Sequence, residues 1–475
     1  MHNEPTRQPP AEDYAWVLSR FAHVVTVSTL PADAIAAAKV NLFDTLACAA
    51  AGSSAAVVPD VRDLALAWGG SHQASTLVFG DRLPAHHAAW VNGTMAHARD
   101  YDDTHDAAVL HAGVSVIPAA LAAAELAGTT AGSDLIAGIA VGLETVCRLG
   151  VATQAGIIET GYMYTPLFGH FGATLAAARV LGLDEAQTVN ALGIAYSQVA
   201  GNHQVTRDAA HTKRIQPGFA AMSALVSVQM AQRGIRGVQE TFDGIDGFLR
   251  VYLHNRCDAK VLRDRLGQRY EFTRLSYKPY PCCRFNHTAI GATLKLRSAK
   301  HIASERISRI RVGLNHQAYE AVCTPVAMRK APRTIVQAQF SIPYTVATAL
   351  IDGGVRLEHF SDAALQRHDI LSLADKVDTY VDVGIEQAYG RNISPAIVTI
   401  KMDDGSSFEE RMDVPLGHPD HPMSGADLAD KAIDCFGASA RPLADGAQQR
   451  LHALIENIEG LDDVRRLMRE LEALS

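Results

Sequence analysis

The stretch from Pro31 to Gly52, PADAIAAAKVNLFDTLACAAAG, sets the pattern for the first half of the chain. Proline is favoured at the start of a helix and glycine at its end. Between them Ile35, Leu42 and Leu46 recur at roughly helical spacing. The stretch therefore predicts one long helix. Its many small residues, mostly alanine, let neighbouring backbones approach closely.

Segments of the same kind, separated by Gly, Pro and Asp, continue from about Ala11 to Tyr252. Ser133 is expected to cap the helix DLIAGIAVGLETVCRLG. Asp184 with Gln187 forms a variant capping box for the helix that runs through Ala195. Other segments, such as FGHFGATLAAARVLG, are rich in Gly and Ala. We predict a densely packed helical body.

The pattern changes after about residue 261. RISRIRVGL alternates, so that Ile310, Val312 and Leu314 share one face of a strand. AIVTIKMDDGSSFEERMDV has two strand-like runs around an Asp-Gly turn at 404–405. Helical segments such as NHTAIGATLKLRSA lie between the strands, which indicates a smaller α+β domain.

The helical pattern returns at Ser424 with SGADLADKAIDCFG, followed by a charged, amphipathic tail. We expect this tail to pack back on the helical body and make that body discontinuous. The predicted domains are 11–268 for the first part of the helical domain, 269–408 for an α+β lid and 409–475 for the C-terminal part of the helical domain.

Composition excludes several classes of protein. The 475 residues are 48% hydrophobic and 20% charged, with a net charge of −8 and no basic run that could bind nucleic acid. The N-terminal MHNEPTRQPPAE lacks the apolar segment of a signal peptide. No uninterrupted apolar stretch approaches the roughly 18 to 20 residues of a membrane span. We expect a folded cytoplasmic protein that binds neither nucleic acid nor membranes.

The densest polar segment is HARDYDDTH, from His97 to His105, followed closely by His111. It has three interpretations: a metal site, a solvated loop, or a catalytic loop in which a carboxylate orients an imidazole at the start of a helix. The candidate metal ligands are Asp100, Asp102, Asp103, His105 and His111. Their spacing lacks the i, i+4 histidine pair with a distal carboxylate, so we predict no metal. Asp100 and His111 fit the catalytic interpretation.

Two other segments carry cations that could face a charged ligand. Lys213 and Arg214 precede a Pro-Gly and a predicted helix, where cations are unfavourable unless an anion is bound. Lys278 and Arg284 lie at the junction of the helical and mixed patterns, where clefts often form. The alternative for both segments is ordinary surface cations and a linker stiffened by proline.

Seven segments taken together resemble the MmgE/PrpD family, which includes 2-methylcitrate dehydratase, cis-aconitate decarboxylase and iminodisuccinate epimerase. In family order they are NLFDTLACAAAG, WVNGTMAHARDYDDTH, HAGVSVIPAALAAAE, TPLFGHFGATLAAARVLGLD, KRIQPGFAA, YKPYPCCRFNH and QAQFSIPYTVATALIDGG. The resemblance implies a mainly α fold: a large discontinuous all-helical domain, a smaller α+β lid, and a cleft between them. It also implies a homodimer.

The resemblance also implies the site. The catalytic residues carried over are Asp100, His111, Lys213, Lys278 and Tyr319. The expected substrate contacts are Arg284, Tyr164, Met163 and Cys283. In the decarboxylases the corresponding segment resembles G-F-H-P-T, whereas this chain reads GYMYT. Met163 therefore stands where the decarboxylases have a histidine, and Cys283 stands where they have another.

The chemistry that the resemblance implies is removal of a proton next to a carboxylate, without iron–sulfur cluster, nucleotide or other cofactor. His111, held by Asp100, is the expected base or acid, with Lys213 or Tyr319 on the opposite side. The leading hypothesis is a dehydratase-type lyase on a citrate-like di- or tricarboxylic acid. The alternatives are an epimerase of an amino- or imino-dicarboxylate, then a decarboxylase, then a non-catalytic metabolite binder.

Overall fold

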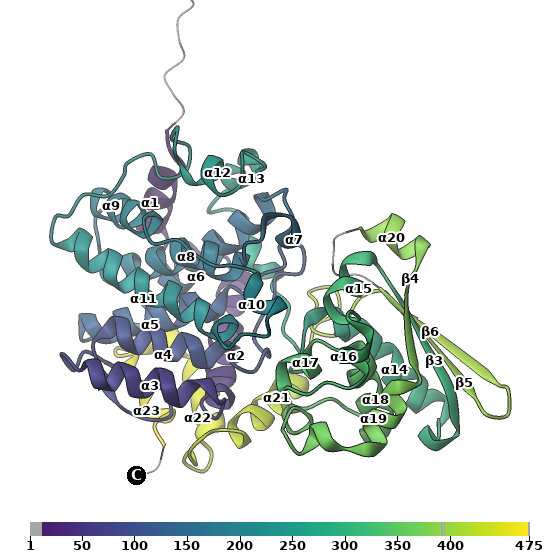
Figure 1. Ribbon diagram of the computed structural model, residues 1–475. Helices are drawn as coiled ribbons and strands as arrows, with labels where there is room; N and C mark the ends of the chain where they lie inside the picture. The colour runs from purple at the N-terminus through teal and green to yellow at the C-terminus, as the bar shows by residue number, and fades with distance from the viewer. Residues whose placement is uncertain (1–11, 391–392, 394, 474–475) are drawn as a thin grey trace, which may run out of the picture.

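Helices dominate the structure, and its buried apolar side chains form two separate cores. The computed structural model describes residues 12–390, 393 and 395–473. One core fills a large helical body, and the other lies in a smaller lid that contains the main sheet (Figure 1). The predicted mainly α fold with a small α+β lid is confirmed.

The first part of the body consists of helices, joined at one edge by a short antiparallel pair of strands. In chain order the elements are α1 (Tyr14–Val24), α2 (Ala32–Gly52), α3 (Val57–Trp68), β1 (Ala74–Ser75), β2 (Arg82–Leu83), α4 (Ala85–His97), α5 (Gly113–Ala127), α6 (Gly132–Ala152), α7 (Ile157–Thr160), α8 (Tyr164–Val180), α9 (Glu185–Tyr196), α10 (Gln204–Arg207), α11 (Thr212–Gln232), α12 (Phe248–Val251), α13 (Ala259–Arg263) and η1 (Glu271–Arg274).

Local signals placed some helix ends correctly and one wrongly. α2 occupies the predicted stretch, and the capping box of Asp184 and Gln187 opens α9. The predicted cap at Ser133 is wrong, because α6 begins at Gly132. The Gly132 backbone N–H donates to the Leu461 carbonyl at 2.8 Å, so a contact with the C-terminal segment defines this helix start.

The crossing of α4 and α11 places the end of α4 beside the start of α11. Gly93 and Gly218 meet at this crossing, and a Cβ on Gly93 would lie 2.8 Å from the Gly218 Cα. Only glycine allows backbones to approach this closely. The polar residues at the end of α4 and in the first turn of α11 are thereby brought together.

The lid packs helices against a four-stranded sheet of order β4-β3-β5-β6. β3 and β4 are parallel, and the other two pairs are antiparallel. Its elements are η2 (Arg284–Asn286), α14 (His287–Lys300), η3 (Ser304–Arg306), β3 (Ile307–Leu314), α15 (His316–Val322), α16 (Val326–Lys330), α17 (Ile335–Gln339), α18 (Ile342–Asp352), η4 (Leu357–His359), η5 (Ala364–Gln366), α19 (His368–Asp375), β4 (Val377–Val381), α20 (Val383–Tyr389), β5 (Ala396–Met402) and β6 (Ser407–Met412).

The predicted strand pattern is confirmed in this sheet. Ile310, Val312 and Leu314 are fully buried along β3. β5 and β6 form the predicted hairpin, and Gly405 in its turn has a φ of +87°, a conformation that favours glycine. α14 covers β5 and β6, which places η2 and the segment before it at the boundary with the body.

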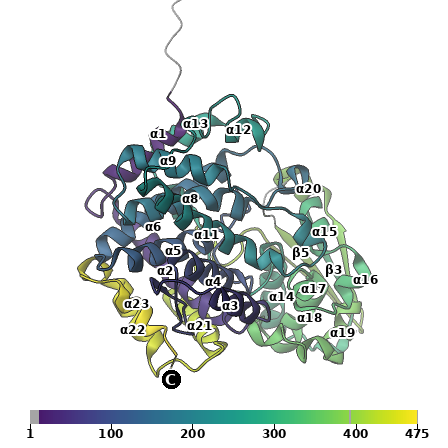
Figure 2. The same cartoon turned by 60° about the vertical axis from the view of Figure 1, so that its left-hand side comes forward.

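The C-terminal tail returns to the body, as expected. It comprises α21 (Gly425–Gly437), α22 (Ala447–Glu456), η6 (Ile458–Gly460) and α23 (Arg465–Glu470). Figure 2 shows these helices in yellow along the lower side of the body. Lys431 on α21 pairs with Asp44 on α2 at 2.5 Å, with both side chains buried. The exact domain boundaries at 268/269 and 408/409 stay predictions.

α2 and α6 are each 21 residues long and apolar enough, by length and composition, to cross a membrane. No stretch of this length and apolar composition was expected from the sequence. Of their most apolar windows, 72% in α2 and 94% in α6 is buried inside the structure. Packing within the helical body therefore accounts for their composition.

Candidate active site

The loop from residue 98 to 112, between α4 and α5, carries most of the candidate site. Asp103 anchors it, because its carboxylate accepts hydrogen bonds from the backbone N–H groups of Ala112 at 2.9 Å and Gly113 at 3.1 Å. These are free donors at the start of α5. Burial and the neighbouring Asp102 carboxylate raise the pKa of Asp103 to about 6. Asp103 thus shapes the loop.

Asp100 joins two lysines from distant parts of the chain. Its Oδ1 accepts a hydrogen bond from Lys278 Nζ at 2.6 Å, and its Oδ2 accepts one from Lys213 Nζ at 3.2 Å. Lys278 also donates to the Asp100 carbonyl at 2.9 Å. Burial opposes ionisation, but the two ammonium groups hold the pKa of Asp100 well below its usual range. The site contains a buried carboxylate between two cations.

Backbone geometry explains how this group assembles. Asp100 has a φ of +55°, a left-handed conformation that Asp tolerates better than most residues. Thr104 and Ser276 form an antiparallel bridge, with N···O distances of 2.8 and 2.7 Å. This bridge holds the segment ending in Lys278 against the loop. Lys213 arrives from the first turn of α11.

Asp102 lies between two imidazoles. Its Oδ2 is 2.9 Å from His97 Nδ1 and 2.8 Å from His111 Nδ1. His111 Nδ1 also lies 2.6 Å from the Asp103 carbonyl oxygen. Burial would raise the pKa of Asp102, but the facing imidazoles hold it well below its usual range. Asp102 therefore orients both rings.

The hydrogen bonds define which ring nitrogens carry protons. His97 Nε2 lies 3.4 Å from the Lys213 ammonium, which can only donate, so His97 accepts there and donates from Nδ1 to Asp102. Burial lowers the pKa of His97 to about 4, which keeps this ring neutral. Both neighbours of His111 Nδ1 are acceptors, so its proton lies on Nδ1 and Nε2 can accept another. The His111 side chain is 15% exposed, whereas Asp102 is fully buried.

The predicted pairing of Asp100 with His111 is wrong. The carboxylate that holds His111 is Asp102, because the backbone turn at Asp100 directs its side chain to the lysines. Sequence reasoning missed His97 as a member of the cluster and treated Asp102 only as a candidate metal ligand. The signal available was the dense HARDYDDTH segment, which does not distinguish among its aspartates.

The expected anion site at Lys213 takes a different form. α11 begins at Thr212, before Lys213, and contains Pro217, so the helix starts earlier than predicted. The anion that meets Lys213 in this first turn is the carboxylate of Asp100. Pro217 is the sixth residue of α11, past the first turn, so it removes one backbone N–H that the helix would otherwise use.

Two expected substrate contacts have partners inside the protein. The Arg284 guanidinium is buried, pairs with Asp106 at 3.0 Å and donates to the Leu416 carbonyl at 3.0 Å. It therefore joins the start of the lid to the loop of residues 98–112. The Tyr164 hydroxyl donates to the Ala155 carbonyl at 2.7 Å. We no longer assign substrate binding to either side chain.

The remaining predicted residues are Met163, Cys283 and Tyr319, which lie at three different elements. Met163 directly precedes α8, and the Thr165 hydroxyl two residues later accepts a hydrogen bond from the His111 backbone N–H at 3.0 Å. Burial, with Asp100 nearby, raises the pKa of the Cys283 thiol to about 11. Tyr319 is half-buried on α15, which packs against η2. Among the described residues no hydrogen bond joins the Tyr319 hydroxyl to the cluster.

His97, Asp102 and His111 could also be considered as metal ligands, since their ligand atoms lie within 4.8 Å of one another. The atoms are, however, at hydrogen-bond distances in the structure. The Lys213 ammonium, 3.4 Å from His97, would repel a cation placed between the rings. The arrangement favours proton transfer over metal binding, and the absence of a metal stays a prediction.

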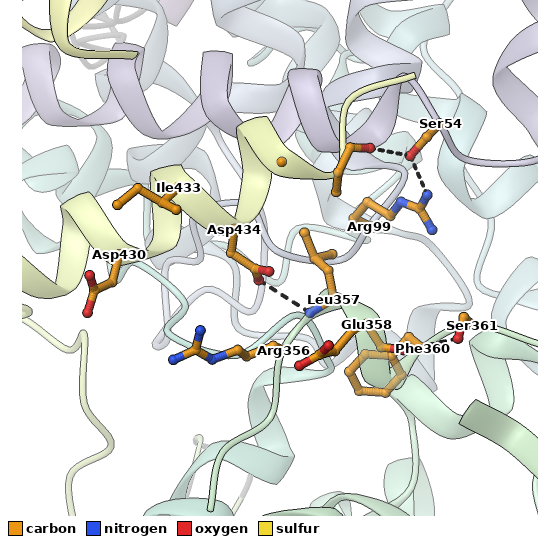
Figure 3. Close-up of a pocket in the computed structure, with 12 residues that line it drawn as sticks. Ser54, Arg99, Arg356, Leu357, Glu358, Phe360, Ser361, Asp430, Ile433 and Asp434 are labelled. Carbon is orange, nitrogen blue, oxygen red and sulfur yellow. Dashed lines mark hydrogen bonds between the residues drawn. The ribbon is translucent and has the colours of Figure 1, made fainter. Parts of the chain in front are cut away.

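A crevice of about 620 Å³ lies between η4 of the lid, α21 and the end of α2 (Figure 3). The Arg99 guanidinium points into it and donates to the Ser54 hydroxyl at 2.6 Å. Arg356 and Asp434 line it from the lid and from α21. Its lining does not include the histidine and lysine groups needed to exchange protons with a substrate, so we place the candidate active site at the buried cluster.

Two family models together match most of the chain. The MmgE/PrpD N-terminal domain matches residues 17–258, and the MmgE/PrpD C-terminal domain matches residues 280–459. The chain belongs to the MmgE/PrpD family, as its sequence motifs predicted.

Individual relatives are similar over nearly their whole length. The cis-aconitate decarboxylase-like protein oryM of Aspergillus oryzae is 28% identical, over 93% of both chains. The cis-aconitate decarboxylase of Aspergillus terreus is 27% identical, over 96% of this chain and 95% of the relative. The human cis-aconitate decarboxylase is 27% identical, over 93% and 91%. These relatives are named as decarboxylases, which are lyases.

Proposed function

We propose that this protein is a lyase that removes a proton next to a carboxylate of a small di- or tricarboxylic acid. The observation that carries the proposal is the buried cluster formed by Lys278, Asp100, Lys213, His97, Asp102 and His111. It places a neutral imidazole next to a fixed ammonium without any bound cofactor being required. Membership of the MmgE/PrpD family and the lyase names of relatives support the same class of reaction.

His111 is the proposed base. Its Nε2 can accept a proton, and Asp102 stabilises the imidazolium that forms. Removing a proton next to a carboxylate builds negative charge on that carboxylate, which needs fixed positive charge nearby. Lys213 supplies it, because Asp100 and Lys278 hold its position.

In a dehydration the steps balance as follows. The carbon-bound proton moves to His111 Nε2, its electron pair forms the carbon–carbon double bond, and the carbon–oxygen bond breaks. The leaving hydroxide takes a proton from Lys213 and departs as water. Lys213 is preferred over Tyr319 as this acid because it is hydrogen-bonded within the cluster.

The test follows proton exchange between substrate and solvent. The unmodified protein, incubated in deuterated water with a panel of di- and tricarboxylic acids, is expected to introduce deuterium next to a carboxylate of at least one of them. Mass spectrometry and proton NMR measure the exchange. A protein that binds a member of the panel by calorimetry but exchanges no proton would be a binder, and the proposal would be wrong.

Activity is expected to survive metal removal. The cluster carries out acid–base chemistry with side chains alone, so treatment with EDTA followed by dialysis should leave the rate within about twofold. Elemental analysis of the treated protein is the control for complete removal. Loss of activity that returns with one added metal, present at one ion per chain beforehand, would contradict the acid–base interpretation.

Decarboxylation of cis-aconitate is the second candidate, favoured by the names of the relatives. Met163 is evidence against this reaction. It stands where the decarboxylase motif G-F-H-P-T has its histidine, and methionine cannot transfer a proton. We therefore expect little or no itaconate and carbon dioxide when the protein is incubated with cis-aconitate. Met163→His, with Met222→His as the control, is the variant that should raise this activity. Efficient turnover by the unmodified protein would show that the histidine is dispensable.

Epimerisation of an amino- or imino-dicarboxylate would use the same base and acid, but nothing in the comparisons favours it. The dehydratase-type reaction stays our first proposal. The homodimer and the cytoplasmic location expected from the sequence also stay proposals.

A further inference from the structure

Arg214 is a buried cation without a carboxylate partner. It lies in the first turn of α11, directly after Lys213, and is 7% exposed. Its guanidinium donates from Nη2 to the side-chain oxygen of Gln339 at 3.3 Å. Within residues 12–390, 393 and 395–473, no carboxylate oxygen lies within 4.0 Å of its nitrogens. Burying an unpaired charge is costly, so such a group indicates a missing anion.

Other buried cations of the protein are paired. Lys213 and Lys278 share Asp100, Arg284 pairs with Asp106, Lys431 with Asp44, and Arg148 with Glu144. Arg214 departs from this pattern. Its partner is a neutral amide at a long hydrogen-bond distance, which leaves most of its five donors for another group.

Gln339 holds this geometry from the lid. Its Nε2 donates to the Arg99 carbonyl at 2.7 Å and to the Pro281 carbonyl at 3.1 Å. Its own carbonyl accepts from the Cys283 backbone N–H at 2.9 Å. With Nε2 used in this way, the Gln339 side-chain oxygen is directed to Arg214. A buried amide thus holds the guanidinium in place without neutralising it.

The surroundings of Arg214 are those of the proposed reaction. The neighbouring side chain on α11, Lys213, contacts both Asp100 and His97. Burial and the nearby Arg99 lower the pKa of Arg214, and the Asp100 carboxylate raises it. Lys213 and Arg214 are each 7% exposed and the His111 side chain is 15% exposed, whereas Lys278 and Asp102 are 1% and 0% exposed.

We propose that Arg214, held by Gln339, binds a second carboxylate of the substrate, the one that does not lie next to the abstracted proton. This subsite rests on the proposed function and assigns one carboxylate of its di- or tricarboxylic acid substrate to a named residue. Arginine suits the role because its planar guanidinium can bind both oxygens of a carboxylate at once. Lys213 is then left for the carboxylate on which charge develops.

The test measures binding, without turnover, of three acids that lose one carboxylate at a time: propane-1,2,3-tricarboxylate, pentanedioate and pentanoate. Calorimetry gives the dissociation constant of each for the unmodified protein and for Arg214→Met. In the unmodified protein each lost carboxylate should weaken binding. In Arg214→Met, one of the two carboxylate removals should raise the dissociation constant at least about tenfold less than it does in the unmodified protein. This difference is the size of a charged hydrogen bond.

Matched variants keep the test decisive. Arg233→Met removes an exposed arginine at the other end of α11. It should leave the ratios of the dissociation constants of the three acids unchanged. Arg214→Lys and Arg214→Gln are measured in parallel, so that a folding failure in one variant does not leave the question open. Arg214→Lys should retain part of the preference for acids with more carboxylates, and Arg214→Gln should lose the part that depends on residue 214. Equal weakening of all three acids in the Arg214 variants would show a structural role and overturn the subsite.

This readout separates the subsite from the proposed function. If the unmodified protein shows the carboxylate dependence at Arg214 but exchanges no substrate proton, the lyase proposal fails and the subsite stands. If proton exchange occurs while Arg214→Met leaves the ratios unchanged, the subsite fails alone. No binding of propane-1,2,3-tricarboxylate at millimolar concentration would also overturn it.

Discussion

Replacing His111 with alanine is expected to lower kcat for the substrate found by proton exchange by about 10² to 10⁴-fold, the contribution of a general acid–base group. The imidazole lies at the partly exposed side of the cluster, and its Nδ1 is held by Asp102 and by the Asp103 carbonyl. The other neutral imidazole of the cluster, His97, is buried and its Nε2 faces the Lys213 ammonium at 3.4 Å, so it should not replace His111 as the base. The variant should fold, because the His111 side chain is 15% exposed and Asp102 keeps His97 as a partner without it.

Steady-state kinetics and the rate of deuterium incorporation measure this effect, and circular dichroism checks folding. His23→Ala is the matched control, because His23 is an exposed residue at the end of α1 and should leave kcat unchanged. A loss of less than about tenfold in a folded His111→Ala protein would remove His111 from the role of base.

Replacing Asp100 with asparagine is expected to lower the free energy of unfolding by about 3 to 5 kcal/mol, because two buried ammonium groups lose their shared carboxylate. The asparagine keeps the size of the side chain, so packing changes little. Denaturant titration measures the loss. Asp134→Asn is the control: Asp134 is half-exposed and pairs with Arg179 at 3.3 Å on the surface, where such pairs contribute about 0 to 1 kcal/mol.

The same variant makes a prediction about pH. The pKa of Asp100 in the folded protein lies below its unfolded value of about 3.9, so its stabilising contribution is present above that pH and is lost as pH falls through the folded pKa. Burial lowers the pKa of Lys278, but the Asp100 carboxylate outweighs this effect and raises that pKa above its unfolded value of about 10.4. This contribution is lost only at still higher pH. The stability gap between the two proteins should therefore be widest between about pH 5 and 10.

Equal stability of Asp100→Asn and the unmodified protein at neutral pH would contradict the buried pair. A gap that grows as pH falls below about 4 would contradict the sign of the Asp100 shift. Both measurements use folded protein and need no substrate, so they test the site independently of the reaction.

The elements of this fold whose ends depend on neighbouring residues were predictable from sequence. Pro31 and Gly52 bound α2, Asp184 and Gln187 cap α9, and the Asp-Gly turn joins β5 to β6. These signals work because the groups that satisfy the backbone lie within a few residues. The start of α6 was missed because its first N–H is bonded to Leu461, more than three hundred residues away.

The sequence by itself determined which segments carry the candidate site: the HARDYDDTH loop, the start of α11 and the segment around Lys278. Only the tertiary structure decided the pairings, namely Asp102 with His111 and Asp100 with the two lysines. Asp100, Asp102 and Asp103 are chemically equivalent along the chain. Their roles differ because of the left-handed backbone at Asp100, the bridge that brings Lys278 to the loop, and the close crossing of α4 and α11. Each of the last two depends on contacts between residues far apart in sequence, which local periodicity does not encode.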